Sequence, residues 1–238
     1  MQILKEKSGL GLINIEALLG IVMCIYIISY VLLFETEYRI FYKVSFFLLV
    51  FFGVIYILLK KRVRFTLFFN FSLIYGIILL ISYIYTPSKE TGIYALLYYS
   101  ICLIVIFILT NYIDSNMKID QLIKALIWGG FAVSLKTIYF YGFDLFSLAS
   151  NYSGNSNSAF RVGGEIGNSN NIGMYCMFSA VFSIYLVNEK KVRSRGLYIF
   201  IGILCVSIGL LTGSKKAILV LFLGSIILFV FKSGDNSI

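Results

Sequence analysis

Residues 161–173 read Arg161-Val-Gly-Gly-Glu165-Ile-Gly-Asn168-Ser-Asn170-Asn171-Ile-Gly173 and close the only long polar segment of a chain that is otherwise largely apolar. Of the 238 residues, 60% are hydrophobic and only 13% are charged, and the mean hydropathy is +0.92. Soluble domains carry about 25% charged residues. This excess of apolar side chains cannot all be buried in one water-soluble core, so the sequence predicts an all-α membrane protein in contact with the lipid bilayer.

Apolar runs lie on both sides of this polar segment. A spanning helix needs roughly 20 predominantly apolar residues. Eight runs are predicted to span, at about 12–34, 40–59, 65–85, 91–112, 121–142, 172–187, 196–212 and 217–231. We therefore expect a polytopic protein with about eight transmembrane helices. It would form a single integral membrane domain over residues 1–238, with one long loop at about 143–171.

The distribution of basic residues predicts the orientation of these spans. Cytoplasmic loops carry an excess of Lys and Arg. With the N-terminus inside, inner loops would hold thirteen of the 20 basic residues and outer loops would hold six. The six outer residues are Arg39, Lys43, Lys89, Arg161, Lys215 and Lys216. Both termini are thus expected in the cytoplasm and the long loop outside. Because the basic residues sit in short clusters between apolar runs, the net charge of +9 does not indicate a nucleic-acid partner.

A second polar interruption, Gly213-Ser214-Lys215-Lys216, lies two predicted spans after the first, and both are expected on the same outer side. Two interpretations of its lysines stand. They can snorkel to the interface at the end of a span. Alternatively, they can bind an anion, because paired cations at a helix start combine charge with free backbone N–H groups.

Arg161 also has two interpretations. It is either a solvated loop residue or a phosphate ligand, because a guanidinium group can bind two oxygens at once. Three nearby glycines would let the backbone approach a ligand closely. Asn168 and Asn170 open the following span, where one suits a helix cap and the other can donate to sugar or phosphate oxygens. Together with the two lysines, these residues form the predicted substrate-binding set.

Two further ionisable residues are candidates. Lys136 lies about six residues inside the outer end of the fifth span, where it is either a functional intramembrane charge or a snorkelling lysine. Glu165 is the weak candidate for a general base, and pairing with Arg161 is its simpler role. The chain has no His, and its four cysteines all lie in apolar runs, so neither a metal site nor a cofactor is expected.

The order of these motifs resembles that of a known family. An outer Arg-x-Gly-Gly-x-x-Gly-Asn-x-Asn segment beginning at Arg161 opens a helix. A basic loop and a further helix follow, and then Gly213-Ser-Lys-Lys-Ala217 at the outer start of the next helix. This order resembles the O-antigen ligase and O-antigen or capsule polymerase family of multispanning bacterial membrane proteins. The match covers roughly the second half of the chain, and the first five spans match in hydropathy alone.

The resemblance implies a GT-C-like helical bundle in the bacterial cytoplasmic membrane. It also implies a glycosyltransferase that polymerises or transfers undecaprenyl-diphosphate-linked oligosaccharide units during synthesis of capsule, O-antigen or another surface polysaccharide. Arg161 with Lys215 or Lys216 would neutralise the charge that develops on the departing diphosphate, without a metal or a nucleotide sugar. A flippase and a chain-length regulator of the same pathway would be partners.

The chain departs from the family pattern at three points. Ser169 stands where many members have Pro, and Lys215 stands where Arg is common. The family also continues through further spans and a second outer loop that carries Arg and, in the ligases, a functionally important His. This chain is therefore expected to correspond to the N-terminal part of a longer architecture. A polymerase-like protein without its catalytic half and a degenerate relative are the alternatives. An incomplete chain would bind a donor without turnover.

A hypothesis from another functional class is a non-enzymatic transporter or flippase for lipid-linked or anionic substrates. Transporters of this kind often contain inverted repeats and helices that are broken near the midplane. Gly129-Gly130 in the fifth span is the candidate position for such a break.

Overall fold

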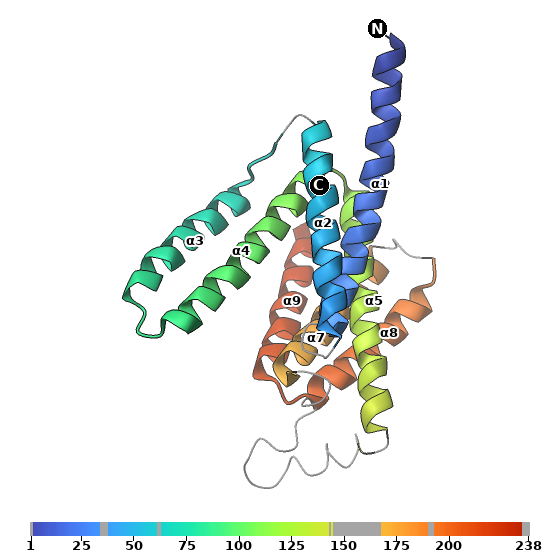
Figure 1. Ribbon diagram of the computed structural model, residues 1–238. Helices are drawn as coiled ribbons and strands as arrows, with labels where there is room; N and C mark the ends of the chain where they lie inside the picture. Colours follow the sequence, from blue (N-terminus) through green and yellow to red (C-terminus); the bar gives the residue numbers. More distant parts are fainter. Residues whose placement is uncertain are drawn as a thin grey trace. The chain divides into compact units, whose positions relative to one another are not determined.

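The computed structural model describes residues 2–33, 38–60, 63–142, 144, 168–189 and 193–234, with the backbone alone for 2–14 and 229–234. This part of the chain forms eight α-helices and no strand (Figure 1). The helices are α1 (Gln2–Leu33), α2 (Arg39–Lys60), α3 (Leu67–Tyr85), α4 (Lys89–Tyr112), α5 (Asn116–Tyr141), α7 (Ser169–Asn188), α8 (Arg195–Leu211) and α9 (Lys215–Gly234). The all-helical fold expected from the sequence is confirmed.

Six of these helices, α1 to α5 and α7, are long and apolar enough to cross a membrane, and α8 is an apolar helix of 17 residues. Many large apolar side chains of α3 and α4 face outward: Phe68 is 66% exposed, Leu80 60% and Tyr98 54%. Apolar surface of this extent requires a lipid or protein environment. The architecture is that of a multi-pass membrane protein. The expected number of eight crossings stays a prediction.

α1 begins at Gln2 and α5 at Asn116, well before the predicted starts at about 12 and 121. α7 and α9 also begin earlier than hydropathy predicts, and there polar caps set the first residues. α7 begins at Ser169 rather than near residue 172, and the side-chain Oδ1 of Asn168 accepts a hydrogen bond from the Asn170 N–H at 2.9 Å. α9 begins at Lys215 rather than at residue 217, and the Ser214 Oγ accepts from the Ala217 N–H at 3.3 Å. Lys215 therefore lies in the first turn of a helix and not in a loop.

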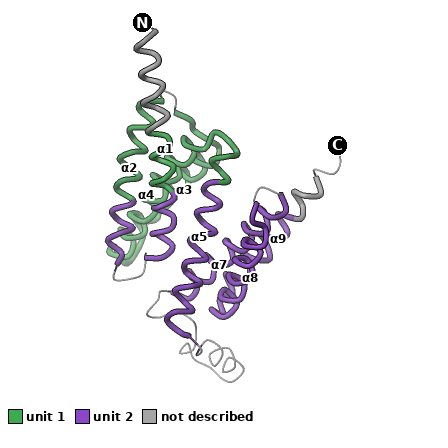
Figure 2. Tube along the Cα trace, turned by 90° about the vertical axis from the view of Figure 1, so that its right-hand side faces the viewer, with its two compact units in different colours: residues 1–23, 46–120 green, residues 24–45, 121–238 purple. Residues whose placement is uncertain are grey.

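The chain divides into two compact units, shown in Figure 2. Unit 1 comprises Met1–Met23 with Phe46–Asp120, and unit 2 comprises Cys24–Ser45 with Gln121–Ile238. In unit 1, α3 and α4 lie side by side as an antiparallel hairpin (Figure 1). Gly76 permits their close approach, because a Cβ there would lie 2.9 Å from the Tyr99 ring.

The core of unit 2 is formed by α5, α7 and α8. Small residues recur along one face of α7 at Gly173, Cys176, Ala180 and Ser183, which is the spacing of successive helical turns. Small residues let membrane helices pack closely. The buried core side chains are Ile123, Ile127, Val133, Ile172, Cys176, Ala180, Leu186, Tyr198, Ile201, Cys205 and Ile208.

The glycine pair in α5 serves helix packing and not a break. α5 is one continuous helix through Gly129 and Gly130. A Cβ on Gly130 would collide with the side chain of Ser179 in α7, and one on Gly129 would lie 3.6 Å from the Val31 Cβ in α1. The possible break at this position is therefore absent from α5.

In unit 1, a polar network joins α1, α2, α5 and the turn between α4 and α5. Lys118 of α5 is 6% exposed and forms ion pairs with Asp114, at 2.7 Å, and with Glu16 of α1. Asp114 also accepts from the Lys60 Nζ of α2 at 3.2 Å. The hydrogen bond from Lys118, assisted by the one from Lys60, holds the pKa of the Asp114 carboxyl below its usual range. Glu16, Lys60 and Lys118 are far apart in the sequence, and the fold brings them together around Asp114.

Replacing Lys118 with Met should lower the melting temperature of the purified full chain in detergent by about 5 °C, because two carboxylates lose their buried cation. Thermal unfolding followed by tryptophan fluorescence measures the change. Lys43→Met, at an exposed lysine of α2, is the control and should melt like the original protein. Equal melting temperatures for the two variants would show that the network does not stabilise the fold.

Candidate functional site

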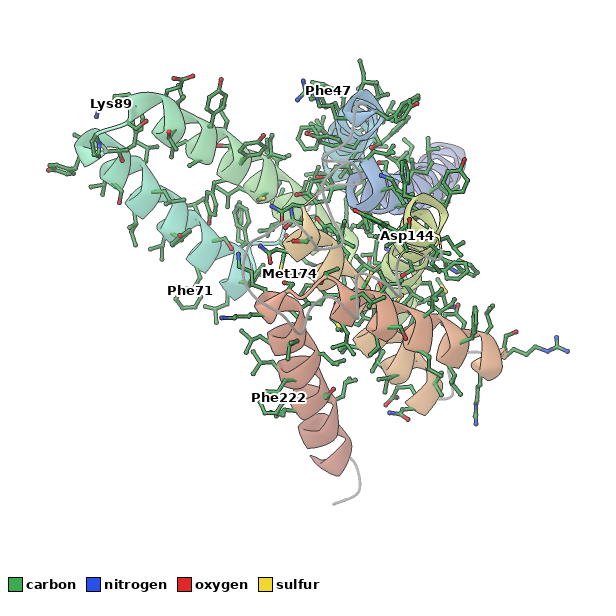
Figure 3. The ribbon with its side chains drawn as sticks, turned by 90° about the horizontal axis from the view of Figure 1, so that it is seen from below. Phe47, Phe71, Lys89, Asp144, Met174 and Phe222 are labelled. Atoms are coloured by element: carbon green, nitrogen blue, oxygen red, sulfur yellow. The ribbon has the colours of Figure 1, made fainter. Side chains whose placement is uncertain are left out.

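The start of α7 packs directly against the turn between α8 and α9. A Cβ on Gly173 would lie 2.5 Å from the Thr212 Oγ1, 2.9 Å from the Ala217 Cβ and 3.2 Å from the Ser214 Cβ. No side chain larger than hydrogen fits in this space without movement of its neighbours. The first turns of α7 and α9 consequently lie side by side. Figure 3 shows this region, with Met174 labelled one residue after Gly173.

The α8–α9 turn is held by hydrogen bonds of two buried hydroxyl groups. The Thr212 Oγ1 donates to the Gly209 carbonyl at 2.6 Å and accepts from the Ser214 N–H at 3.4 Å. Gly213 has φ +59°, in the left-handed region that glycine adopts without strain. Ser214 then caps α9 through the Ala217 N–H. The Thr-Gly-Ser sequence thus fixes the direction in which α9 leaves the turn.

The start of α7 is fixed by Asn168. Its backbone carbonyl accepts from the N–H groups of Asn171 and Ile172, each at 3.0 Å, in addition to the side-chain bond to Asn170. Asn168 is exposed, and Asn170 is half-buried in the first turn. Of the two asparagines selected from the sequence, Asn168 is therefore the helix cap, and the side chain of Asn170 is not needed for that role.

This end of unit 2 is electrostatically positive. Two helix N-termini lie together, and each carries a partial positive charge. Lys215 and Lys216 are exposed in the first turn of α9, and neither α7 nor α9 has an acidic residue in its first turn. Among the residues that the structure describes, neither lysine has a hydrogen-bond or ion-pair partner. Helix N-termini with nearby cations are suited to bind phosphate or carboxylate anions.

Lys136 has a different position from the other predicted site residues. It is half-buried in α5, and its Nζ donates to the Leu32 carbonyl of α1 at 3.3 Å. The last carbonyls of a helix have no partner within the helix. This contact therefore gives Lys136 a role at the C-terminus of α1. It is not one of the groups that the contact of Gly173 brings together.

The other two predicted residues, Arg161 and Glu165, lie outside the described residues. The described site therefore consists of Asn168, Asn170, Lys215 and Lys216 on two neighbouring helix starts. Sequence reasoning did not select Thr212, whose signal was a Thr-Gly-Ser turn between two apolar runs. Comparison with protein-family models, with curated proteins and with solved structures found no match.

Replacing Gly173 with Ala should destabilise the full chain by about 1–3 kcal/mol, because the new Cβ meets buried Thr212 and Ala217. The measurement is the melting temperature in detergent. Gly196→Ala in α8 is the matched control, since a Cβ there has no heavy atom within 4 Å. The control should be neutral or slightly stabilising. If Gly173→Ala behaved like Gly196→Ala, the close approach of α7 to the turn would be contradicted.

Proposed function

We propose that this chain binds an undecaprenyl-diphosphate-linked oligosaccharide at the starts of α7 and α9, and takes part in its polymerisation or transfer at the outer face of a bacterial cytoplasmic membrane. One observation carries the proposal: the contact of Gly173 places two helix N-termini and two exposed lysines side by side. The resemblance of the motif order to O-antigen ligases and polymerases supports the choice of substrate.

The chemistry of a lipid-linked diphosphate suits this position. The polyprenyl tail holds the diphosphate at the membrane surface, and Lys215 and Lys216 lie at the start of an apolar helix. Their ammonium groups, with N–H groups in the first turns, can neutralise two or more phosphate oxygens. Arg161, from the segment before α7, would add a bidentate ligand.

In the proposed transfer, an acceptor hydroxyl attacks the anomeric carbon of the donor. A new carbon–oxygen bond forms as the bond to the diphosphate oxygen breaks, and the hydroxyl proton passes to a base. Negative charge grows on the leaving diphosphate, so cations and N–H groups fixed at that point stabilise the transition state. Glu165 is the sequence-based candidate for the base.

The proposal includes a location and partners. The basic residues favour both termini in the cytoplasm, which would place the starts of α7 and α9 outside. A flippase would deliver the lipid-linked units to that side, and a chain-length regulator would act on the product. The transporter hypothesis had Gly129-Gly130 as a possible break, and α5 is continuous there.

The double substitution Lys215→Gln and Lys216→Gln should weaken binding of undecaprenyl diphosphate by about 10- to 30-fold, because two charged phosphate ligands are lost. Binding is measured on the purified full chain in nanodiscs. Undecaprenol, which has the same tail and no phosphate, shows the part of the affinity due to the tail. Arg161→Ala should also weaken binding of undecaprenyl diphosphate.

The matched control is Arg39→Gln with Lys43→Gln, which removes the same charge from two exposed positions at the start of α2. This control should bind undecaprenyl diphosphate like the original chain. If the two double variants were equally weakened, general charge and not a site would explain binding. If neither bound less diphosphate, the proposed function would be wrong.

A further inference from the structure

A groove lies in unit 2 between α7 and α8, toward the end of α7 that is opposite to Gly173. It has a volume of about 310 Å³. Ligand pockets commonly have about 300–1,000 Å³. The lining is mostly apolar, and it includes Ser183, Val187, Asn188, Tyr198, Gly202 and Ser207.

The hydroxyl of Ser183 gives this groove an unsatisfied polar group. Ser183 is 1% exposed, and its Oγ has no hydrogen-bond partner within the part of the chain that the structure describes. A serine inside a helix commonly donates to the carbonyl four residues earlier, as Ser179 does to Tyr175 at 2.9 Å. A buried hydroxyl without a partner is unfavourable. Ser183 lines the groove, so rotation of its side chain would present the covered Oγ to an acceptor there and remove this cost.

Two arginines lie toward one end of the groove, where the described acidic residue is Glu189, directly after α7. Arg193 and Arg195 are exposed at the start of α8, and neither has an ion-pair or hydrogen-bond partner among the described residues. The N-cap residue Ser194 makes no side-chain cap hydrogen bond, so no capping side chain occupies the first N–H groups of α8. Tyr198, one turn later, already lines the groove. The groove therefore leads from a positive helix start into apolar surroundings.

We propose that this groove binds one anionic diacyl phospholipid from the leaflet on the side where α8 begins. Its phosphate lies beside Arg193, Arg195 and the free N–H groups of α8. One ester carbonyl accepts a hydrogen bond from the Ser183 Oγ, and an acyl chain follows the apolar lining past Gly202. Ser183 lies five residues before Asn188, the end of α7, which is about 7 Å along the helix axis. In a phospholipid, the ester carbonyls lie a few bonds below the phosphate, which agrees with this depth.

The chemistry of the groove favours a phospholipid over other occupants. Its rim carries exposed apolar side chains, among them Ile184 at 42%, Ile199 at 49% and Ile203 at 63%. A free phosphate ion would satisfy the arginines and leave the apolar part empty. A helix from a second copy would fill the apolar part and leave the arginines without an anion. A phospholipid satisfies both parts, and it does so independently of the diphosphate site at the other end of α7.

The first experiment is native mass spectrometry of the purified full chain in detergent, titrated with dioleoylphosphatidylglycerol or dioleoylphosphatidylcholine. The two lipids share their acyl chains and differ in charge. The original chain should retain phosphatidylglycerol about 30-fold more strongly, because two arginines near the headgroup attract its negative charge. Equal retention of the two lipids would contradict the charged half of the proposal.

Substitutions at two positions of α8 test the position of the lipid. Gly202→Leu should abolish retention of phosphatidylglycerol, because Gly202 lines the groove and its Cβ would point to Ser183 at 3.5 Å. Phe200→Leu in the same helix is the control, because Phe200 is 56% exposed, does not line the groove and lies outside the first turn of α8. If both leucine variants retained phosphatidylglycerol like the original chain, the groove would not be the site. If Gly202→Leu reduced a dimer and left lipid retention unchanged, the groove would be a contact between two copies.

Polar substitutions separate the two parts of the site. Ser183→Ala removes only an unsatisfied hydroxyl, so the chain should fold, and both lipids should bind about 3- to 10-fold more weakly. Arg193→Gln with Arg195→Gln should lower phosphatidylglycerol to the level of phosphatidylcholine. The control variant, Arg39→Gln with Lys43→Gln, should still bind phosphatidylglycerol more strongly than phosphatidylcholine. Unchanged lipid binding by the Ser183 variant would rule out the proposed hydrogen bond to the ester. If the arginine variant still bound phosphatidylglycerol more strongly than phosphatidylcholine, the headgroup contact would be ruled out.

Discussion

The contact of Gly173 with Thr212, Ser214 and Ala217 is the constraint on which the proposed function of unit 2 depends. It requires α7 and α9 to begin next to each other. α8, which connects them in the sequence, therefore runs in the opposite direction. The N-termini of α7 and α9 then lie at one end and the N-terminus of α8 at the other. Since each helix N-terminus carries partial positive charge and each C-terminus partial negative charge, the two N-termini of α7 and α9 favour an anion at the first end. At the second end the C-termini of α7 and α9 oppose the N-terminus of α8, so the positive charge there comes from Arg193 and Arg195.

Small residues make this arrangement possible in a membrane. Lipid tails are as apolar as most side chains, so helices associate mainly by close packing and by polar contacts. Glycines at four places let α7 approach its neighbours: Gly173 itself, Gly130 beside Ser179, and Gly209 and Gly224, where a Cβ would lie 2.8 Å from the side chains of Met177 and Val181. Because the packing is this close, a larger side chain at any of these glycines would displace its neighbours. The groove at Ser183 and Gly202 is therefore a local departure from packing that is tight elsewhere along α7.

Hydropathy was sufficient to predict the helices, because a span is a local property of about 20 residues. The starts of α7 and α9 differ from the prediction by two or three residues, since Asn168 and Ser214 cap them through hydrogen bonds that hydropathy does not contain. The network of Lys118 with Glu16 joins residues about a hundred positions apart, and no local pattern indicates such a pair. Gly173 was within the stretch selected from the sequence, but its partners became clear only from the packing.

The candidate site was predictable to the extent that it is local. Lys215 and Lys216 stood out as cations between two apolar runs, and Asn168 stood out as a cap. Lys136 was selected for its depth, and its contact with the end of α1 could not be read from the sequence. The unsatisfied hydroxyl of Ser183 was equally hidden, because a serine in an apolar run normally bonds to its own helix.

The most direct test of the central claim asks which side of the membrane the starts of α7 and α9 face. Single cysteines at Asn168→Cys and at Lys216→Cys, in chains whose four native cysteines are replaced by serine or alanine, are labelled in intact cells with a membrane-impermeant maleimide. Glu189→Cys, just after the last residue of α7, reports the opposite side. We predict that positions 168 and 216 label in intact cells, and that position 189 labels only after permeabilisation. Labelling of 168 and 216 from opposite sides, or of both only after permeabilisation, would contradict the proposed site.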